Sequence, residues 1–239
     1  MKTKKYNQKF YETLEQSTLK SARKIVPYLI SIFHPKKVLD VGCGLGIWLK
    51  EFSKRNIDIT GIEGKWILDK ENLYIKKDRI LVKDLSEGIF KMNNRFDLTI
   101  CLEVAEHLPK ESATRFINSL TNTSDVIVFS AAIPFQGGTN HLNEQYQSFW
   151  ASLFKKRGFV PLNLIREKFW QDKEILSHYL QNTLIYVKKS KLDNISASAK
   201  LNFQLDIVHP REYEWFAIPC KRIKSLLPGF LLNLIRRFK

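Results

Sequence analysis

The 239-residue sequence has few cysteines, no long apolar run and fewer acidic than basic side chains, and each shortage excludes a class of protein. Its three cysteines, Cys43, Cys101 and Cys220, are too far apart for a close ligand pair or a disulfide framework. No run of about 18 apolar residues, the length of a membrane-spanning helix, is present. The first residues, MKTKKYNQKFYETLEQ, lack the apolar segment of a secretory signal. We therefore expect a cytoplasmic protein with reduced thiols.

The shortage of acids leaves 39 basic side chains against 24 acidic ones and a net charge of +15. Such an excess favours an anionic partner, namely nucleic acid, a phosphorylated substrate or a membrane surface, although it also fits a lysine-rich composition without any function. Six of the basic residues and no acid lie in the tail 218–239, around the apolar run LLPGFLLNLI. This tail predicts binding at an anionic membrane surface, unless it packs on the domain or on the second subunit of a homodimer. We interpret residues 190–239 as a linker and a C-terminal basic amphipathic extension.

The remainder of the chain has the pattern of an α/β protein. Small or apolar residues recur at helical spacing until Pro35, which predicts an N-terminal helical cap over residues 1–35. Strand-like segments then alternate with helical ones, namely KVLDV, IDITGI, RILVK, DLTICLE and DVIVFSA. The alternation predicts a domain over residues 36–189 with a mainly parallel sheet and helices on both faces. A helix over residues 143–156 and two further strands, FVPLNLI and NTLIYVKK, would close the sheet with an antiparallel pair.

A glycine-rich loop follows the first predicted strand. The segment DVGCGLG opens a helix and lets backbone amides approach a polar ligand closely; its glycines are Gly42, Gly44 and Gly46. The second strand ends in Glu63, 21 residues beyond Gly42, where an acid accepts hydrogen bonds from ribose hydroxyls. The third strand runs into Asp84, placed to accept from an adenine amino group, with Leu85 beside the ring. The three features in register favour an adenosyl ligand.

Over roughly Lys36–Lys188 the sequence resembles the class I S-adenosylmethionine-dependent methyltransferases. VLDVGCGLG is similar to their first motif, which implies that Asp40 lies near the methionine end of the cofactor. Glu63 matches their ribose-binding acid, Asp84 their adenine-contacting acid, and FDLTICLEVAEHL their fourth motif. The resemblance implies a Rossmann-like sheet of seven strands and S-adenosylmethionine as cofactor. The loop lacks the G-x-G-x-x-G spacing of nicotinamide cofactors, which argues against a dehydrogenase.

The segment LEVAEHL carries candidate catalytic residues. If a helical turn begins at Glu103, Glu106 and His107 project to the same side as Glu103. His141, in QGGTNHLNEQ after the fifth strand, reaches the same crevice. These four residues would make an open site for a divalent ion, Mg, Mn, Fe or Zn. The E-x-x-E-H pattern resembles that of metal-dependent methyltransferases that modify the terminal ribose of small RNAs or the catechol rings of ubiquinone precursors.

Two alternatives to the metal site stay open. An alcohol acceptor needs a base or a metal, whereas an amine or a carbanion can react without either. In the metal-free alternative His141 is the general base, and Glu103 and His107 lie on the acceptor side. In the other alternative these side chains have structural roles within the fold.

The acceptor is predicted from the loop after the fifth strand. QGGTNHLNEQYQSFW is similar to class I methyltransferases of bacterial surface-polysaccharide biosynthesis, which implies a sugar hydroxyl as acceptor. Asn140 and Glu144 would read its hydroxyl pattern, because polar sites reject partners that leave them unpaired. Aromatic residues of a later insertion would wall the acceptor pocket: Trp170, His178 and Tyr179.

Three functions therefore follow from the sequence. The first is an O-methyltransferase for a sugar hydroxyl of a glycan or glycolipid intermediate, peripheral on the inner face of the membrane. The second is an RNA ribose 2'-O-methyltransferase that uses the net charge of +15 to bind phosphates, although the chain has no recognisable RNA-binding module. The third is a non-catalytic, membrane-associated complex subunit, since a fold alone does not establish activity.

Overall fold

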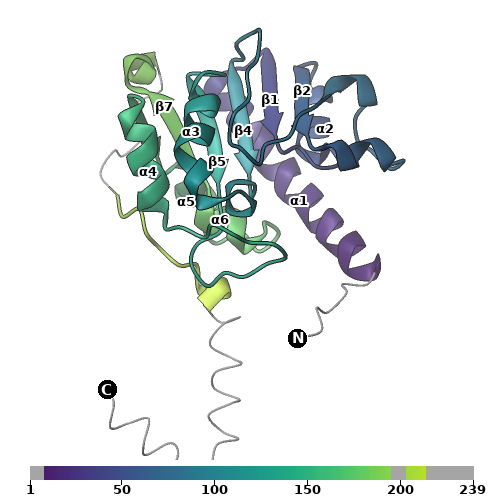
Figure 1. Ribbon diagram of the computed structural model, residues 1–239. Helices are drawn as coiled ribbons and strands as arrows, with labels where there is room; N and C mark the ends of the chain where they lie inside the picture. Colours follow the sequence, from purple (N-terminus) through teal and green to yellow (C-terminus); the bar gives the residue numbers. More distant parts are fainter. Residues whose placement is uncertain (1–7, 195–202, 214–239) are drawn as a thin grey trace, which may run out of the picture.

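The computed structural model describes residues 8–194 and 203–213, and its centre is a seven-stranded sheet (Figure 1). The strands are β1 Lys37–Val41, β2 Asp58–Glu63, β3 Ile80–Val82, β4 Leu98–Leu102, β5 Val126–Ser130, β6 Phe159–Leu162 and β7 Leu184–Lys188. Their order in the sheet is β3-β2-β1-β4-β5-β7-β6. β7 pairs antiparallel with β5 and β6, and the other neighbouring pairs are parallel. The predicted parallel sheet with a closing antiparallel pair is confirmed.

Helices cover both faces of this sheet, as predicted. The α-helices of the described residues are α1 Gln8–Phe33, α2 Ile47–Ser53, α3 Ala113–Thr121, α4 Gln147–Lys156, α5 Leu164–Phe169 and α6 Ser177–Asn182. Core contacts divide them into two layers, with α1, α2, α5 and α6 on one face and α3 and α4 on the other (Figure 1). Successive strand residues point to opposite layers, as Val38 and Leu39 do. Among these helices none has the length and apolarity of a membrane span.

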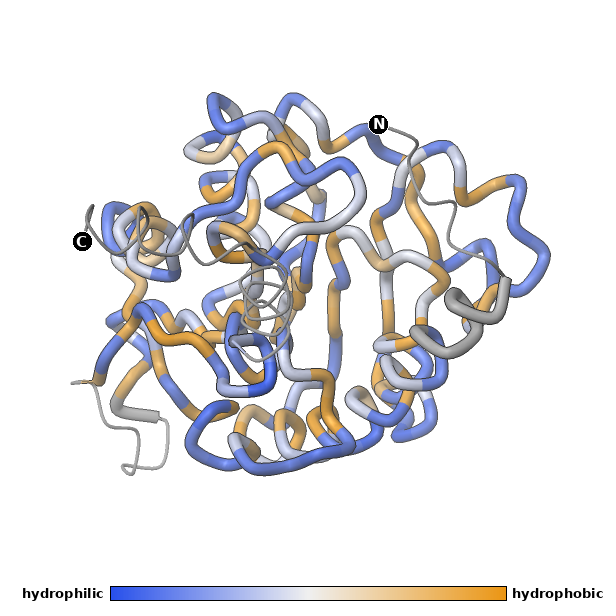
Figure 2. Tube along the Cα trace, turned by 90° about the horizontal axis from the view of Figure 1, so that it is seen from below, coloured by the Kyte–Doolittle hydropathy of each residue, from blue (hydrophilic) through white to orange (hydrophobic). Residues whose placement is uncertain are grey.

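The parallel strands bring their following loops to one edge of the sheet. Asp40 of β1 lies opposite Gly61 of β2 and Ile100 of β4, so these three strands end side by side. In open sheets of this kind ligands bind outside the carboxyl ends of the strands. Figure 2 looks from below and shows hydrophilic loops around the hydrophobic strands.

The helix predicted from residue 143 begins later. α4 starts at Gln147, and the preceding residues are tied to the strand ends instead. Gln145 N donates to Ala132 O at 3.2 Å, and Asn143 N donates to Glu106 O at 2.9 Å. These long-range bonds hold the chain extended, so the predicted start of the helix is wrong.

Residues 203–213, here termed the strap, are packed on the domain. Arg166 Nη1 donates to Leu205 O at 2.9 Å, and Ser148 N donates to Asp206 Oδ1 at 2.7 Å. The strap therefore belongs to the same folded unit as α4 and α5. The predicted membrane-binding tail 218–239, with Cys220, lies outside the described residues.

Candidate active site

The glycine loop between β1 and α2 has the left-handed backbone that favours glycine. Gly42, Gly44 and Gly46 have φ angles of +78°, +51° and +83°. A Cβ on Gly42 would lie 2.4 Å from Val104 Cγ2, and one on Gly46 would lie 2.6 Å from Ile75 Cγ1. A Cβ on Gly44 would meet no atom within 4 Å. Packing therefore requires two of the glycines, and the third faces open space where a ligand can approach the backbone.

A hollow of about 410 Å³ joins the predicted cofactor residues to the predicted catalytic ones. Its lining includes Gly42, Glu63, Asp84 and Leu85. It also includes Glu103 and His107, which follow β4. The arrangement brings the adenosyl-binding and acceptor sides of the prediction into one continuous space.

Glu63 ends β2 and is held by the loop around it. Its Oε2 accepts from Gly44 N at 2.7 Å, and its Oε1 accepts from Gly64 N at 2.7 Å and from Trp66 Nε1 at 3.0 Å. A carboxylate has about four acceptor positions, so these bonds leave capacity for a ribose hydroxyl. Trp66, which the sequence analysis missed, is 48% exposed and stands at the rim of the hollow.

The two aspartates differ in environment. Asp40 is 3% exposed, and its Oδ2 has no hydrogen-bond partner among the described residues. Burial, together with the nearby Glu63 carboxylate, raises the pKa of Asp40 well above its ordinary value. Asp84 is exposed, and the hydrogen bond from Ser86 N at 2.8 Å lowers its pKa. The unpaired Asp40 oxygen and the ionised Asp84 fit a ligand with an ammonium group at one end and an adenine at the other.

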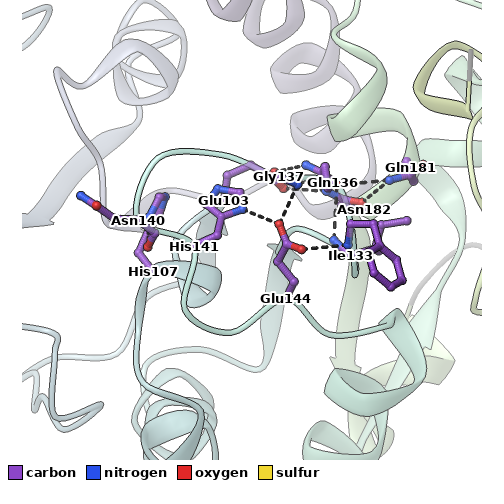
Figure 3. Close-up of polar contacts among 11 residues, drawn as sticks. Glu103, His107, Ile133, Gln136, Gly137, Asn140, His141, Glu144, Gln181 and Asn182 are labelled. Carbon is purple, nitrogen blue, oxygen red and sulfur yellow. Dashed lines mark hydrogen bonds and ion pairs between the residues drawn. The ribbon is translucent and has the colours of Figure 1, made fainter. Parts of the chain in front are cut away.

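The turn after β4 differs from the predicted helical turn. Glu103 has a φ of +57°, and a 3-10 turn begins only at Ala105. This left-handed residue directs the Glu103 carboxylate toward two amides. It accepts from Asn182 Nδ2 at 3.1 Å and from Gln136 Nε2 at 3.3 Å (Figure 3). The expectation that Glu103 joins the metal ligands is therefore wrong, because the backbone turns before the helical spacing applies.

The other three predicted ligands lie together. Glu106, His107 and His141 each offer a ligand atom within 4.8 Å of the other two. His107 Nδ1 donates to the carbonyl oxygen of Asn140 at 3.3 Å, and His141 Nδ1 donates to Glu144 Oε1 at 2.9 Å. A carbonyl oxygen and a carboxylate oxygen can only accept, so each ring carries its proton on Nδ1. The Nε2 atom of each neutral ring is then unprotonated and can bind a cation. Histidine ligands of metals are oriented by bonds of this type.

Glu106 is buried without a partner for its charge. It is 0% exposed, and neither carboxylate oxygen makes a hydrogen bond within the described residues. Burial, and then the Glu103 carboxylate, raises its pKa well above the ordinary value, and the nearby backbone amides of Glu106 and Ala132 offset only part of that rise. Burial and His141 lower the pKa of His107. A buried carboxyl group with no partner is costly. A cation between Glu106 and the two histidines would supply the missing partner, so the residues present fit a divalent metal.

Glu144 supports the loop that carries it. Its carboxylate accepts from Phe135 N at 2.8 Å, Gly137 N at 2.7 Å and His141 Nδ1 (Figure 3). These three bonds hold the Glu144 carboxylate on its own loop, and its predicted contact with a sugar hydroxyl stays a prediction. Asn140 has an exposed side chain with a φ of +60°, so its predicted role in substrate binding stays open.

The aromatic wall is not formed as predicted. Tyr179 is 7% exposed, and its ring packs edge-on against Trp48 with centroids 5.1 Å apart, because α6 belongs to the core. Trp170 lies against His209 of the strap, with centroids 4.4 Å apart. Tyr179 is therefore a core residue rather than a wall of an open pocket, whereas the predicted substrate contact of Trp170 stays a prediction. His178 is half-buried beside Tyr179, and its predicted substrate contact remains untested.

An amide cluster that the sequence did not predict surrounds Glu103. Gln136, Gln181 and Asn182 form a hydrogen-bonded group around Glu103 (Figure 3). The available signal was the polar pair Gln181 and Asn182 inside the otherwise apolar segment YLQNTLIYV. Two amides at buried positions usually have hydrogen-bond partners that the sequence does not reveal.

Comparisons with known proteins agree with this architecture. Among curated proteins, the ubiquinone biosynthesis O-methyltransferase of Pseudomonas syringae pv. tomato is 37% identical over 86 residues, which are 33% of this chain and 36% of that protein. The enzyme of the same name from Chromobacterium violaceum is 33% identical over 108 residues, 40% of this chain and 44% of that protein. The chain thus spans less than half the length of these relatives.

Solved structures show the same fold at low identity. Streptomyces venezuelae DesVI has a TM-score of 0.56 at 13% identity, with 74% of this chain and 94% of that chain covered. SAM-bound CalS10, an amino pentose methyltransferase from Micromonospora echinaspora, has a TM-score of 0.55 at 13% identity, with 79% and 100% covered. A family model described as a methyltransferase domain matches residues 14–158, more than half of the chain. The protein therefore belongs to the methyltransferase-domain family.

Proposed function

We propose that the protein transfers the methyl group of S-adenosylmethionine to a sugar hydroxyl of a glycan or glycolipid intermediate, with help from a divalent cation. The observation that carries the proposal is the group Glu106, His107 and His141, with both Nδ1 atoms bound elsewhere and the Glu106 carboxylate unpaired. A hydroxyl is a poor nucleophile until its proton is removed or its pKa is lowered. A bound divalent cation supplies that lowering.

The chain's own residues divide the remaining work. In the transfer, the acceptor hydroxyl loses its proton to solvent, its oxygen bonds to the methyl carbon, and the carbon–sulfur bond breaks with its electron pair staying on sulfur. Gly44 and Glu63 would hold the adenosyl part, and Asp40 would face the methionine part. Glu106, His107 and His141 would hold the cation beside the acceptor hydroxyl. These positions would align the acceptor for in-line attack, which is the main requirement of the reaction.

His141 also supports a metal-free version of the same reaction. The proton on its Nδ1 is held in the hydrogen bond to Glu144, so the unprotonated Nε2 is available to take the acceptor's proton. A carboxylate in that position holds the ring in the orientation and tautomer that leave Nε2 as the acceptor, as in histidine-carboxylate pairs of hydrolases. Dependence of the rate on added metal separates this version from the first.

Two similarities support an oxygen acceptor on a sugar. The curated relatives are named O-methyltransferases, and the structural neighbour CalS10 is an amino pentose methyltransferase. The resemblance of QGGTNHLNEQYQSFW to surface-polysaccharide enzymes points the same way. The basic tail 218–239 would then keep the enzyme at the inner membrane face, near lipid-linked intermediates.

A labelling experiment tests the proposal. The purified protein is incubated with methyl-labelled cofactor, a panel of free and lipid-linked saccharides, small RNAs, and Mg, Mn, Fe or Zn. We expect label in a saccharide, its loss on adding chelator, and its loss in His107→Ala. His34→Ala, an exposed histidine remote from the site, should keep full activity and serves as control. Chelator-resistant labelling would leave only the version with His141 as base.

The net charge of +15 favours RNA as a second candidate acceptor. Label in RNA ribose without label in any saccharide would replace the sugar by RNA. Absence of cofactor binding to the purified protein would instead favour a non-catalytic subunit.

A further inference from the structure

Glu103 lies where the cofactor hollow meets the acceptor side. It lines the same hollow as Gly42 and Glu63, and it follows β4, the strand that pairs with β1 at Asp40. Because Glu63 marks the ribose end, the methionine end of an adenosyl cofactor lies toward β1 and β4. A carboxylate at Glu103 is therefore on the side of the cofactor's sulfonium centre.

The Glu103 side chain is held by two amide groups. Asn182 Nδ2 donates to its oxygens at 3.1 and 3.3 Å, and Gln136 Nε2 donates at 3.3 Å. Asn182 is 3% exposed, and its Nδ2 also donates to Gln136 Oε1 at 3.0 Å. The left-handed φ of +57° at Glu103 carries a conformational cost. Such a backbone at the edge of a site points to a functional role for the direction of this side chain.

A chain of amides connects Glu103 to the strap. His209 N donates to Gln181 Oε1 at 2.8 Å, and Gln181 Nε2 donates to Asn182 Oδ1 at 3.0 Å. A backbone N–H at one end can only donate, and a carboxylate at the other end can only accept. The direction of every bond between them is therefore fixed, and so is the orientation of both amides.

We propose that Asn182 and Gln136 are positioning residues that aim the Glu103 carboxylate at the sulfonium centre of the cofactor, and that Gln181 makes this placement depend on the strap. The negative charge stabilises the positive sulfur-bearing end of the bound cofactor and fixes the methyl group in front of the acceptor. The proposal rests on the use of S-adenosylmethionine in the proposed function and is independent of the acceptor's identity.

The test compares two cofactor analogues and needs no acceptor. Sinefungin carries an amine where the cofactor carries its transferable methyl group, whereas S-adenosylhomocysteine is neutral there. Dissociation constants for both are measured by calorimetry with chelator present, so that no cation shares the site. We expect the wild type to prefer sinefungin, and Glu103→Gln to reduce that preference on the order of tenfold, because it removes one charge from a partly desolvated pair.

Asn182→Ala is expected to reduce the preference similarly, and to add nothing in the Glu103→Gln background, because both changes act through one carboxylate. Gln181→Met, which keeps the size but loses all three side-chain hydrogen bonds of Gln181, should follow the same pattern. Asn163→Ala, a half-buried asparagine that makes no bond to Glu103, is the matched control and should leave the preference unchanged. Gln136→Met replaces Asn182→Ala if thermal melting shows that the latter does not fold.

Each outcome of this test either supports or overturns the positioning role. An unchanged preference in Glu103→Gln, or a full additional effect of Asn182→Ala in that background, overturns the positioning role. If wild-type protein binds both analogues, such a result leaves the proposed function standing. If wild-type protein binds neither analogue, the use of the cofactor fails and the positioning role fails with it.

Discussion

Gly44 is the residue at which ligand binding and folding can be separated. Its missing side chain faces open space, unlike those of Gly42 and Gly46. We expect Gly44→Arg to weaken binding of S-adenosylhomocysteine by about 100-fold or more, equivalent to ~2.7 kcal/mol. The fold should survive, since a side chain at its φ of +51° costs about 1–2 kcal/mol. Calorimetry and a thermal melt measure the two effects.

Gly158 provides the control for this substitution. It has a φ of +78°, and a Cβ there would also meet no atom within 4 Å, but it lies after α4, away from the hollow. Gly158→Arg should show the same conformational cost with unchanged affinity. Equal affinities in Gly44→Arg and Gly158→Arg would show that the glycine loop does not contact the ligand.

Glu144 is expected to act on His141 rather than on substrate. Glu144→Gln keeps the size and an acceptor oxygen but removes the charge that fixes the His141 Nδ1 proton. We expect kcat to fall by about 10–100-fold with KM for the acceptor little changed, as for other carboxylates that orient a functional histidine. Steady-state kinetics test this, with Glu111→Gln, an exposed acid, as control. A rise in KM alone would restore the substrate-binding role.

The residues that lie together as expected are those whose position depends on strand ends. Gly42, Glu63 and Asp84 line one hollow because parallel strands end at one edge of the sheet, a property that the alternating pattern already contains. The directions of the Glu103 and Glu144 side chains were not foreseen, for a different reason. Their directions depend on a left-handed φ at Glu103 and on backbone amides of the loop at Glu144, which no spacing in the sequence encodes.

At the scale of elements, one buried cation contributes to holding the strap on the domain. Arg166 of α5 is 2% exposed and donates to Leu205 O once and to Gln181 O twice. Burial lowers its pKa to about 10, so it remains charged near neutral pH. The sequence did not reveal that the strap packs on the domain, because its anchors lie at distant positions that local composition does not show.

Arg166→Met should release the strap. The side-chain volume is largely kept, but three charged hydrogen bonds are lost, at a cost of about 2–4 kcal/mol in the free energy of unfolding. The Leu205 carbonyl loses its bond from Arg166, and the Gln181 carbonyl keeps only the bond from Gln147 Nε2. Urea denaturation measures this cost, and hydrogen exchange should rise at Leu205 and His209. Lys168→Met, on an exposed position of the same helix, should change neither. Protection of the strap that survives Arg166→Met would show that other contacts suffice to hold it.

At the scale of the whole molecule, the metal hypothesis predicts opposite effects on stability with and without a cation. The buried, unpaired Glu106 destabilises the metal-free fold, so Glu106→Met should raise its unfolding free energy by about 1–2 kcal/mol. A cation at 100 times its Kd should stabilise wild-type protein by about 2.7 kcal/mol, which raises Tm by roughly 5–10 °C for a chain of this size. Glu106→Met should lose that response entirely, whereas His34→Ala should keep it. The diagnostic result is a reversal of order: Glu106→Met has the higher Tm without a cation, and the wild type has the higher Tm once Mn or Zn is added. If none of Mg, Mn, Fe and Zn changes the wild-type Tm, Glu106 is a protonated structural acid and His141 is the base.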